Sequence, residues 1–325
     1  MRRRRADTHG SRPDGTALRA GAPEPRTPRA PRRAPASRRS ERDARAVVYG
    51  PALAGHAYRA RRSSIANVPA DGLSLLARSA SRGGVFSDFD GCLAPIVPDP
   101  DAARAVRGAN AVLERLGARF LVVAVVSGRS VADLRRRVRA RGVRLVGLHG
   151  MEEWRDGALH VAPEAEGARE AVERAAARLE QGLAPADGAV LERKGLALAV
   201  HFRRAPDPDA VERVAGPIVR AAAEREGLRV VPGRRILEVR PAGGGDKGDA
   251  IRRIIDAERL NGALVAGDDV GDLPAFEAIA GLEVGVRVAV ASPEGPPDLL
   301  ARADVTVGSP SEYVALLDRL ARNAG

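Results

Sequence analysis

One stretch decides the fold expected of this 325-residue chain: Val85-Phe86-Ser87-Asp88-Phe89-Asp90-Gly91-Cys92. Its first two residues are typical of the end of a short buried strand. Side chains alternate along a strand, so Asp88 and Asp90 leave it on the same side, and Gly91 then allows a tight turn. Two adjacent carboxylates repel each other unless a cation or a proton lies between them, which is the chemistry of a Mg²⁺ site with one carboxylate free to act as a nucleophile. An ordinary Asp-Gly turn is the alternative, so this motif alone decides nothing.

The positive charge of the chain is concentrated near its N-terminus. The formal net charge is +11, yet residues 1–62 contain 17 Arg, no Lys and five acidic residues. The remaining residues carry 36 basic and 37 acidic side chains, a net charge of −1. We therefore expect a nearly neutral folded part, whose composition does not require nucleic acid as a partner.

The cysteine and hydropathy patterns favour a cytoplasmic protein without membrane contact, and we expect a monomer. The single cysteine, Cys92, excludes an internal disulfide and a cysteine-clustered metal site, as expected in a reducing compartment. No run approaches the roughly 18 apolar residues that a membrane span needs. No apolar segment follows the N-terminal arginines, so a secretory signal is not expected, and the acidic residues and prolines there disfavour a transit peptide.

Composition and periodicity divide the chain into three parts. Residues 1–66 are rich in Arg, Pro and Ala and are expected to be a disordered tail, because they cannot bury enough apolar surface to offset chain entropy. Strands alternate with helices in 67–154 and 241–325, which predicts a parallel sheet whose ligands collect at the carboxyl ends of the strands. Residues 155–240 are predicted to be an inserted α/β cap domain. Its expected elements are a helix at 164–179, a hairpin at 189–202, a helix at 210–225 and strands at 228–231 and 236–240.

The alternating part is predicted from its apolar runs and helical periodicity. After the opening strand, further strands are expected at 120–126, 143–148, 263–266, 283–288 and 303–307. The expected helices lie at 71–80, 106–116, 131–139, 247–257, 273–279 and 311–321.

Polar residues follow these strands in four places. They are Asp88 with Asp90, then Ser127, then Lys247, then Asp268 with Asp269 and Asp272. Each has an ordinary alternative: Ser127 as a helix cap, Lys247 as a solvated residue, and the last aspartates as a turn and cap. A parallel sheet can bring all four places to one crevice, where a phosphate needs a nucleophile, a hydroxyl donor, a cationic clamp and a metal. Their joint presence therefore favours phosphoryl chemistry.

From about residue 72 to 320 the chain resembles the haloacid dehalogenase-type phosphatases and, more closely, the trehalose-6-phosphate phosphatase family. The resemblance is carried by D-F-D-G-C-L-A-P-I from Asp88, S-G-R from Ser127, G-L-H-G-M-E from Gly147, L-E-V-R-P from Leu237, K-G from Lys247 and G-D-D-V-G-D from Gly267. It implies a Rossmann-like, parallel-sheet α/β core with an inserted α/β cap domain. It also implies Mg²⁺-dependent hydrolysis of trehalose 6-phosphate to trehalose and phosphate through an aspartyl-phosphate, as in trehalose biosynthesis.

The same resemblance implies roles for the core residues. Asp88 is expected to attack phosphorus, and Asp90 to protonate the leaving sugar oxygen and then deprotonate water. Ser127 and Lys247 are expected to bind the phosphoryl oxygens. The implied metal ligands are the Asp88 side chain, the Asp90 carbonyl and Asp268, with Asp269 and Asp272 orienting or completing the shell.

The resemblance also implies contacts to the sugar. Arg129, His149 and Glu152 are expected to contact it from the core, and Glu192, Lys194 and Glu238 from the cap. Ordinary solvated hairpin charge is the alternative for Glu192 and Lys194. His201 and Arg203 fit the family pattern too, with structural roles as the alternative.

Several positions depart from the family pattern. Cys92 stands where Thr is usual, and Gly271, Leu273 and Pro274 replace the usual Thr, Glu and Asp, so a reduced turnover is one expectation. Two competing functions stay open: a capped phosphatase for another sugar phosphate, or a catalytically silent regulator that binds a sugar phosphate. The intact Asp88, Asp90, Ser127, Lys247 and Asp268 argue against a silent protein. A receiver-type switch phosphorylated on Asp would have no use for a cap of about 85 residues.

Overall fold

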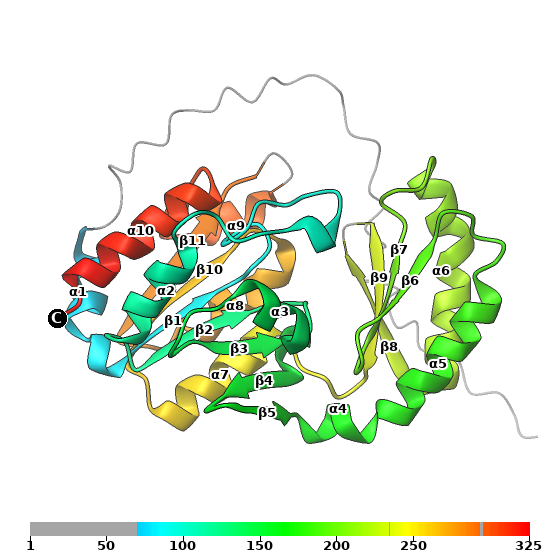
Figure 1. Ribbon diagram of the computed structural model, residues 1–325, viewed down its shortest axis with the longest axis horizontal. Helices are drawn as coiled ribbons and strands as arrows, with labels where there is room; N and C mark the ends of the chain where they lie inside the picture. Colours follow the sequence, from blue (N-terminus) through cyan, green and yellow to red (C-terminus); the bar gives the residue numbers. More distant parts are fainter. Residues whose placement is uncertain (1–69, 234, 293–294) are drawn as a thin grey trace, which may run out of the picture. The chain divides into compact units, whose positions relative to one another are not determined.

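The computed structural model describes residues 70–233, 235–292 and 295–325. The predicted tail at 1–66 lies outside the described residues. All of the described residues belong to one compact unit. The described strands form two sheets, one of eight strands and one of four (Figure 1).

The larger sheet has the strand order β12-β11-β10-β1-β2-β3-β4-β5. Neighbours from β12 to β3 are parallel, and β3, β4 and β5 pair antiparallel. This confirms the predicted α/β fold class. The strands are β1 (Gly83–Ser87), β2 (Val122–Val126), β3 (Arg144–Gly147), β4 (Glu152–Arg155), β5 (Ala158–Val161), β10 (Gly262–Gly267), β11 (Val284–Val290) and β12 (Val305–Val307).

Strand β1 lies in the middle of this sheet, between β10 and β2. Ser87 at its end is level with Ala266 of β10 and Val125 of β2. The chain proceeds from β1 to β2 and β3 on one side, and β10 later pairs with the other side of β1. Such a reversal of strand order opens a crevice at the carboxyl ends of the strands. The residues that follow β1, β2 and β10 therefore converge at one edge.

Helices cover both faces of the parallel strands, which explains their continuous apolar runs. Val123 and Val125 of β2 face a core formed with α1, α2, α3 and α10, whereas Val122 and Ala124 face a core formed with α7, α8 and α9 (Figure 1). The helices are α1 (Ala70–Arg78), α2 (Ala109–Gly117), α3 (Val131–Arg137), α7 (Lys247–Glu258), α8 (Leu273–Ala278), α9 (Pro297–Arg302) and α10 (Pro310–Asn323).

The smaller sheet is antiparallel, with the order β6-β7-β9-β8, and packs against two helices. Its core contains Val200 and Val239 of the sheet with Leu179 and Val219 of the helices. The hairpin predicted around Lys194 is present, as β6 and β7. The elements of this module are α4 (Pro163–Gly167), α5 (Arg169–Gly182), β6 (Val190–Arg193), β7 (Leu198–His201), α6 (Pro208–Arg225), β8 (Leu228–Gly233) and β9 (Ile236–Pro241).

Three features differ from the sequence-based expectations. The β4–β5 hairpin was not predicted, and β5 extends the larger sheet within residues assigned to the cap. Its strands are half-buried or exposed, so they carry no apolar pattern that would indicate them. The helix expected at 164–179 is divided at Ala168 into α4 and α5, and α9 is additional.

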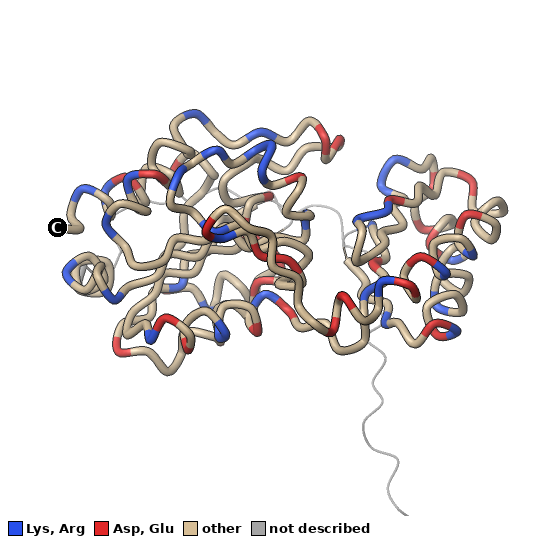
Figure 2. The backbone as a smooth tube through the Cα atoms, turned by 60° about the horizontal axis from the view of Figure 1, so that its bottom comes forward, with Lys and Arg blue, Asp and Glu red and all other residues tan. Residues whose placement is uncertain are grey.

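Charged residues of both signs are mixed along the described chain. Figure 2 shows blue and red segments interspersed over the helices of both modules, in line with the near-neutral balance of this part. No helix within the described ranges is long and apolar enough to cross a membrane.

Candidate active site

Three aspartates meet at the carboxyl edge of the larger sheet. Asp88 follows β1, Asp268 follows β10, and Asp272 ends the 3₁₀ turn η5 (Val270–Asp272). Each offers a carboxylate oxygen, and these oxygens lie within 4.8 Å of one another. All three residues are buried. We call this group the aspartate cluster.

Lys247 is the cation paired with the aspartate cluster. Its Nζ lies 2.7 Å from Asp88 Oδ2 and 2.7 Å from Asp272 Oδ1. Lys247 begins α7, where Asp246 and Asp249 form a capping box that fixes the first turn. The alternative of a solvated lysine is therefore wrong, because this side chain is buried between two carboxylates.

The electrostatics of the cluster show an excess of negative charge. Burial raises the pKa of Asp88 to about 7, against the opposing charge of Lys247. Burial and the neighbouring Asp88 raise the pKa of Asp268 to about 8. Burial alone would lower the pKa of Lys247, but Asp272 and Asp88 outweigh it and raise that pKa. One ammonium therefore leaves three clustered carboxylates undercompensated, and their oxygen donors fit a hard divalent cation.

Two glycines make room for these carboxylates. A Cβ at Gly91, whose φ is +81°, would lie 2.1 Å from Asp268 Cγ. A Cβ at Gly267 would lie 2.2 Å from Asp272 Cβ. Backbone hydrogen bonds complete the fit, since the amides of Asp268 and Asp269 donate to Asp272 Oδ2 at 3.0 and 3.2 Å. The G-D-D-V-G-D segment thus places Asp272 beside Asp268.

Asp90 is bound through both of its carboxylate oxygens by the guanidinium fork of Arg129. Arg129 donates from Nε to Asp90 Oδ2 at 2.6 Å and from Nη2 to Asp90 Oδ1 at 2.8 Å. Arg129 also donates to Asp133 at 2.6 Å and stacks over Phe89. Such a bidentate pair fixes the orientation of the carboxylate. Arg129, expected to contact sugar, therefore contacts the predicted acid and base.

Ser127 lies at the end of β2, buried at the same edge. Its Oγ accepts a hydrogen bond from the Arg129 amide at 3.3 Å, and its carbonyl accepts one from the His149 amide at 2.9 Å. The cap of α3 is Ser130, whose side chain accepts from Asp133 N. The alternative of Ser127 as that cap is therefore wrong, which leaves its hydroxyl for another partner.

A second charged group joins the two modules. Glu238 of β9 accepts from Lys194 Nζ at 3.0 Å and lies 3.2 Å from His149 Nε2, and Arg240 contacts both Glu238 and His149. We call His149, Lys194, Glu238 and Arg240 the Glu238 cluster. Burial lowers the pKa of His149 to about 4. Burial would raise the pKa of Glu238, but His149, Lys194 and Arg240 outweigh it and lower that pKa.

The predicted sugar contacts Glu192 and Glu152 lie outside the Glu238 cluster. Glu192 lies 2.7 Å from His201 and 3.9 Å from Lys194, with its side chain 49% exposed. Glu152 accepts from the Val131 amide at 2.8 Å, which ties it to the start of α3.

Asp269, among the predicted metal ligands, accepts from the Val270 amide at 2.6 Å and caps η5.

Three residues take a larger part in the site than the sequence predicts: Asp272, Arg240 and Asp133. Asp272 lies inside the aspartate cluster, although it was expected only to orient or complete the metal shell. Arg240 is buried against His149 and Glu238, and its place in L-E-V-R-P was the available signal. Asp133, in the first turn of α3, anchors Arg129, which lies just before that helix.

Cys92 packs against the same core. It is fully buried beneath the D-x-D-G turn, and burial together with Asp268 raises the pKa of its thiol well above the usual range. The thiol is therefore protonated and enclosed.

The strand-end aspartates lie on a parallel-sheet core that is followed by a second α/β module, the arrangement expected of a capped phosphatase. The chain belongs to the trehalose-phosphatase family, whose model matches residues 86–299. It is 41% identical over 244 residues to a trehalose-phosphate phosphatase of Mycobacterium avium, covering 73% of this chain and 61% of that protein. It is 39% identical over 259 residues to the Mycobacterium tuberculosis protein of that name, covering 78% and 63%. The chain thus spans about three fifths of these relatives' length.

Solved structures share the fold. The C-terminal domain of Candida albicans trehalose-6-phosphate phosphatase aligns with a TM-score of 0.61 at 23% identity, over 77% of this chain and 95% of that one. The C-terminal domain of a Candida albicans trehalose synthase regulatory protein aligns with a TM-score of 0.55 at 14% identity, over 73% of this chain and 94% of that one. Fold alone therefore does not separate an enzyme from a regulator.

Proposed function

We propose that this protein hydrolyses trehalose 6-phosphate to trehalose and inorganic phosphate. The observation that carries the proposal is the meeting of Asp88, Asp268 and Asp272 with Lys247 at the end of β1. These are the residue types that phosphoryl transfer needs, in a chain of the trehalose-phosphatase family. The retention of the whole group favours an enzyme over a silent regulator.

In the proposed mechanism Asp88 is the nucleophile. An Asp88 carboxylate oxygen forms a bond to phosphorus while the bond from phosphorus to the sugar oxygen breaks, and Asp90 gives its proton to that oxygen. In the second step Asp90 takes a proton from water, which attacks phosphorus and releases phosphate from Asp88. The fork from Arg129 orients the Asp90 carboxylate and occupies both of its oxygens, so one of these two hydrogen bonds must be released before Asp90 can carry and donate a proton.

Charge compensation comes from Lys247, Ser127 and a metal ion. The ammonium of Lys247 and the hydroxyl of Ser127 would bind phosphoryl oxygens. Asp88, Asp268 and Asp272 would hold Mg²⁺, which when bound supplies positive charge at the phosphoryl group. The Asp90 carbonyl and Asp269 remain predicted ligands.

The sugar would be bound by the Glu238 cluster together with Glu192. Its acceptors and donors, Glu238, Lys194 and His149, come from both modules, so a bound sugar would exchange their mutual contacts for contacts with its hydroxyls. Arg129 and Glu152 remain predicted contacts. We place the reaction in the cytoplasm, in keeping with the single, reduced cysteine.

Phosphate release from trehalose 6-phosphate, sucrose 6-phosphate and glucose 6-phosphate, with and without Mg²⁺, tests the proposal. Trehalose 6-phosphate is expected to be the best substrate, and Asp88→Asn to lower kcat by at least about 10³-fold. The control is Asp318→Asn, which changes a surface ion pair and should keep full activity. Equal rates for the three esters would refute the substrate, and an active Asp88→Asn would refute the mechanism.

A further inference from the structure

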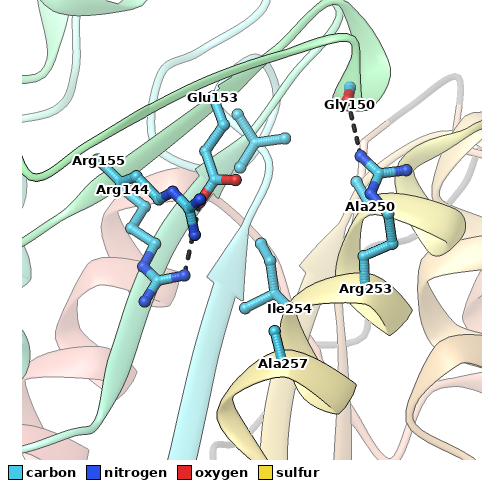
Figure 3. Close-up of a pocket in the computed structure, with 9 residues that line it drawn as sticks. Arg144, Gly150, Glu153, Arg155, Ala250, Arg253, Ile254 and Ala257 are labelled. Carbon is cyan, nitrogen blue, oxygen red and sulfur yellow. Dashed lines mark hydrogen bonds and ion pairs between the residues drawn. The ribbon is translucent and has the colours of Figure 1, made fainter. Parts of the chain in front are cut away.

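A cavity of about 210 Å³ lies between α7 and the strands β3 and β4, outside the proposed active site. Figure 3 shows Arg144, Glu153 and Arg155 on the strand side and Arg253 with Ile254 on the helix side. A water molecule occupies about 30 Å³ in the liquid, so the cavity has room for a larger guest. We call it the arginine cavity.

The arginine cavity carries more positive than negative charge. Its lining contains three arginines and one carboxylate, Glu153. Arg144 is neutralised, since it pairs with Glu258 and lies 3.5 Å from Glu153. Within the described residues, Arg155 and Arg253 form no ion pair. Two guanidinium groups without a carboxylate therefore line the same cavity.

Two buried polar atoms in the lining also lack a hydrogen bond. They are Arg155 Nε, a donor, and Glu153 Oε1, an acceptor. A buried polar atom without a partner is unfavourable, so these two side chains gain hydrogen bonds if they turn toward a guest that accepts from one and donates to the other. A phosphate group with a hydroxyl does both, because its oxygens accept from arginine and its hydroxyl donates.

Arg253 connects the cavity to the turn behind it. It donates to the Gly150 carbonyl at 2.8 Å, and Gly150 has a φ of +107°. A Cβ at Gly150 would lie 2.6 Å from Ala250 Cβ, so helix and turn are in close contact. The Arg253 guanidinium therefore lies at the edge of the cavity, where it can exchange its hydrogen bond to the Gly150 carbonyl for one to a bound anion.

We propose that the arginine cavity is an accessory binding site for phosphate or a small phosphomonoester. Arg155 and Arg253 contact the phosphoryl oxygens, and Glu153 accepts from a hydroxyl of the guest. The site is independent of the reaction proposed above, because its lining includes none of the residues given a role there.

Calorimetric titration of the Mg²⁺-loaded protein with inorganic phosphate tests the proposal. Arg155→Gln is expected to take up one phosphate fewer per chain than the unmodified protein, or to bind it at least about tenfold more weakly. This difference does not depend on whether the active site also binds phosphate. Arg253→Gln should act in the same direction. The matched control is Arg252→Gln on the same helix, which lies outside the cavity lining and should bind as the unmodified protein does.

Two further measurements check that the variants fold and compare free phosphate with a phosphate ester. Thermal unfolding without phosphate checks that each variant is folded. If Arg155→Gln does not fold, Arg253→Gln replaces it as the test variant, because Arg253 is exposed and its substitution should not disturb the core. A titration with glucose 6-phosphate in an Asp88→Asn background shows whether an ester or free phosphate binds more tightly. Identical stoichiometry and affinity in the unmodified protein and both cavity variants, for both probes, would overturn the proposal.

Discussion

The aspartate cluster and the Glu238 cluster use the same kinds of side chain with different charge balance. In the first, three buried carboxylates share one lysine. In the second, one carboxylate, Glu238, contacts Lys194, Arg240 and His149. The first group therefore needs an added cation, whereas the second is satisfied by its own members until a polar ligand replaces their contacts.

Among the changes that compare these two clusters, the largest expected effect comes from a glycine beside the aspartate cluster. Gly91→Ala should lower activity and Mg²⁺ affinity by at least about 100-fold, because its Cβ would meet the Asp268 carboxylate. Calorimetric Mg²⁺ binding and phosphate release measure it. Gly157→Ala is the matched control: its φ of +79° is similar, but nothing lies within 4 Å of the added Cβ. Equal losses in both variants would mean that backbone strain, not the carboxylate contact, is responsible.

An intermediate effect is expected in the Glu238 cluster. Glu238→Gln should raise KM for trehalose 6-phosphate about tenfold and lower the free energy of unfolding by about 1–3 kcal/mol, because Lys194 and Arg240 lose a charged partner. Steady-state kinetics and urea unfolding check this. Glu277→Gln, which changes an exposed pair with Arg302, should alter neither quantity. An unchanged KM would remove Glu238 from the sugar site.

The smallest effect concerns pH. The raised pKa values of Asp88 and Asp268 mean that the metal-free folded protein keeps protons that the unfolded chain releases. These two groups therefore lower metal-free stability as pH rises from about 4 to about 8, whereas His149, whose pKa is lowered to about 4, opposes them below about pH 6.5. Mg²⁺ binds the ionised carboxylates, so it should raise Tm on the order of 5 °C at about pH 8 and less at about pH 6. Calorimetric scans at both pH values measure this, and a larger shift at the lower pH would contradict it.

The sequence was sufficient for the parts of the fold that bury apolar surface. Phe120–Val126 predicted a strand covered on both faces, and β2 is buried throughout. The β4–β5 hairpin escaped prediction because its residues are too exposed to carry an apolar pattern. The sequence also could not predict ion pairs between distant residues. Arg129 and Asp90 are 39 residues apart, and they meet only because both follow strands that end at the same edge of the sheet.

The burial of Cys92 gives the molecule an internal reporter. It is the chain's one thiol, and it lies enclosed beside Asp88 at the centre of the larger module. A maleimide can reach it only in molecules whose interior has opened, so the rate of labelling measures how often that module unfolds. Mg²⁺ or a substrate that stabilises the closed interior would slow the labelling, without any engineered probe.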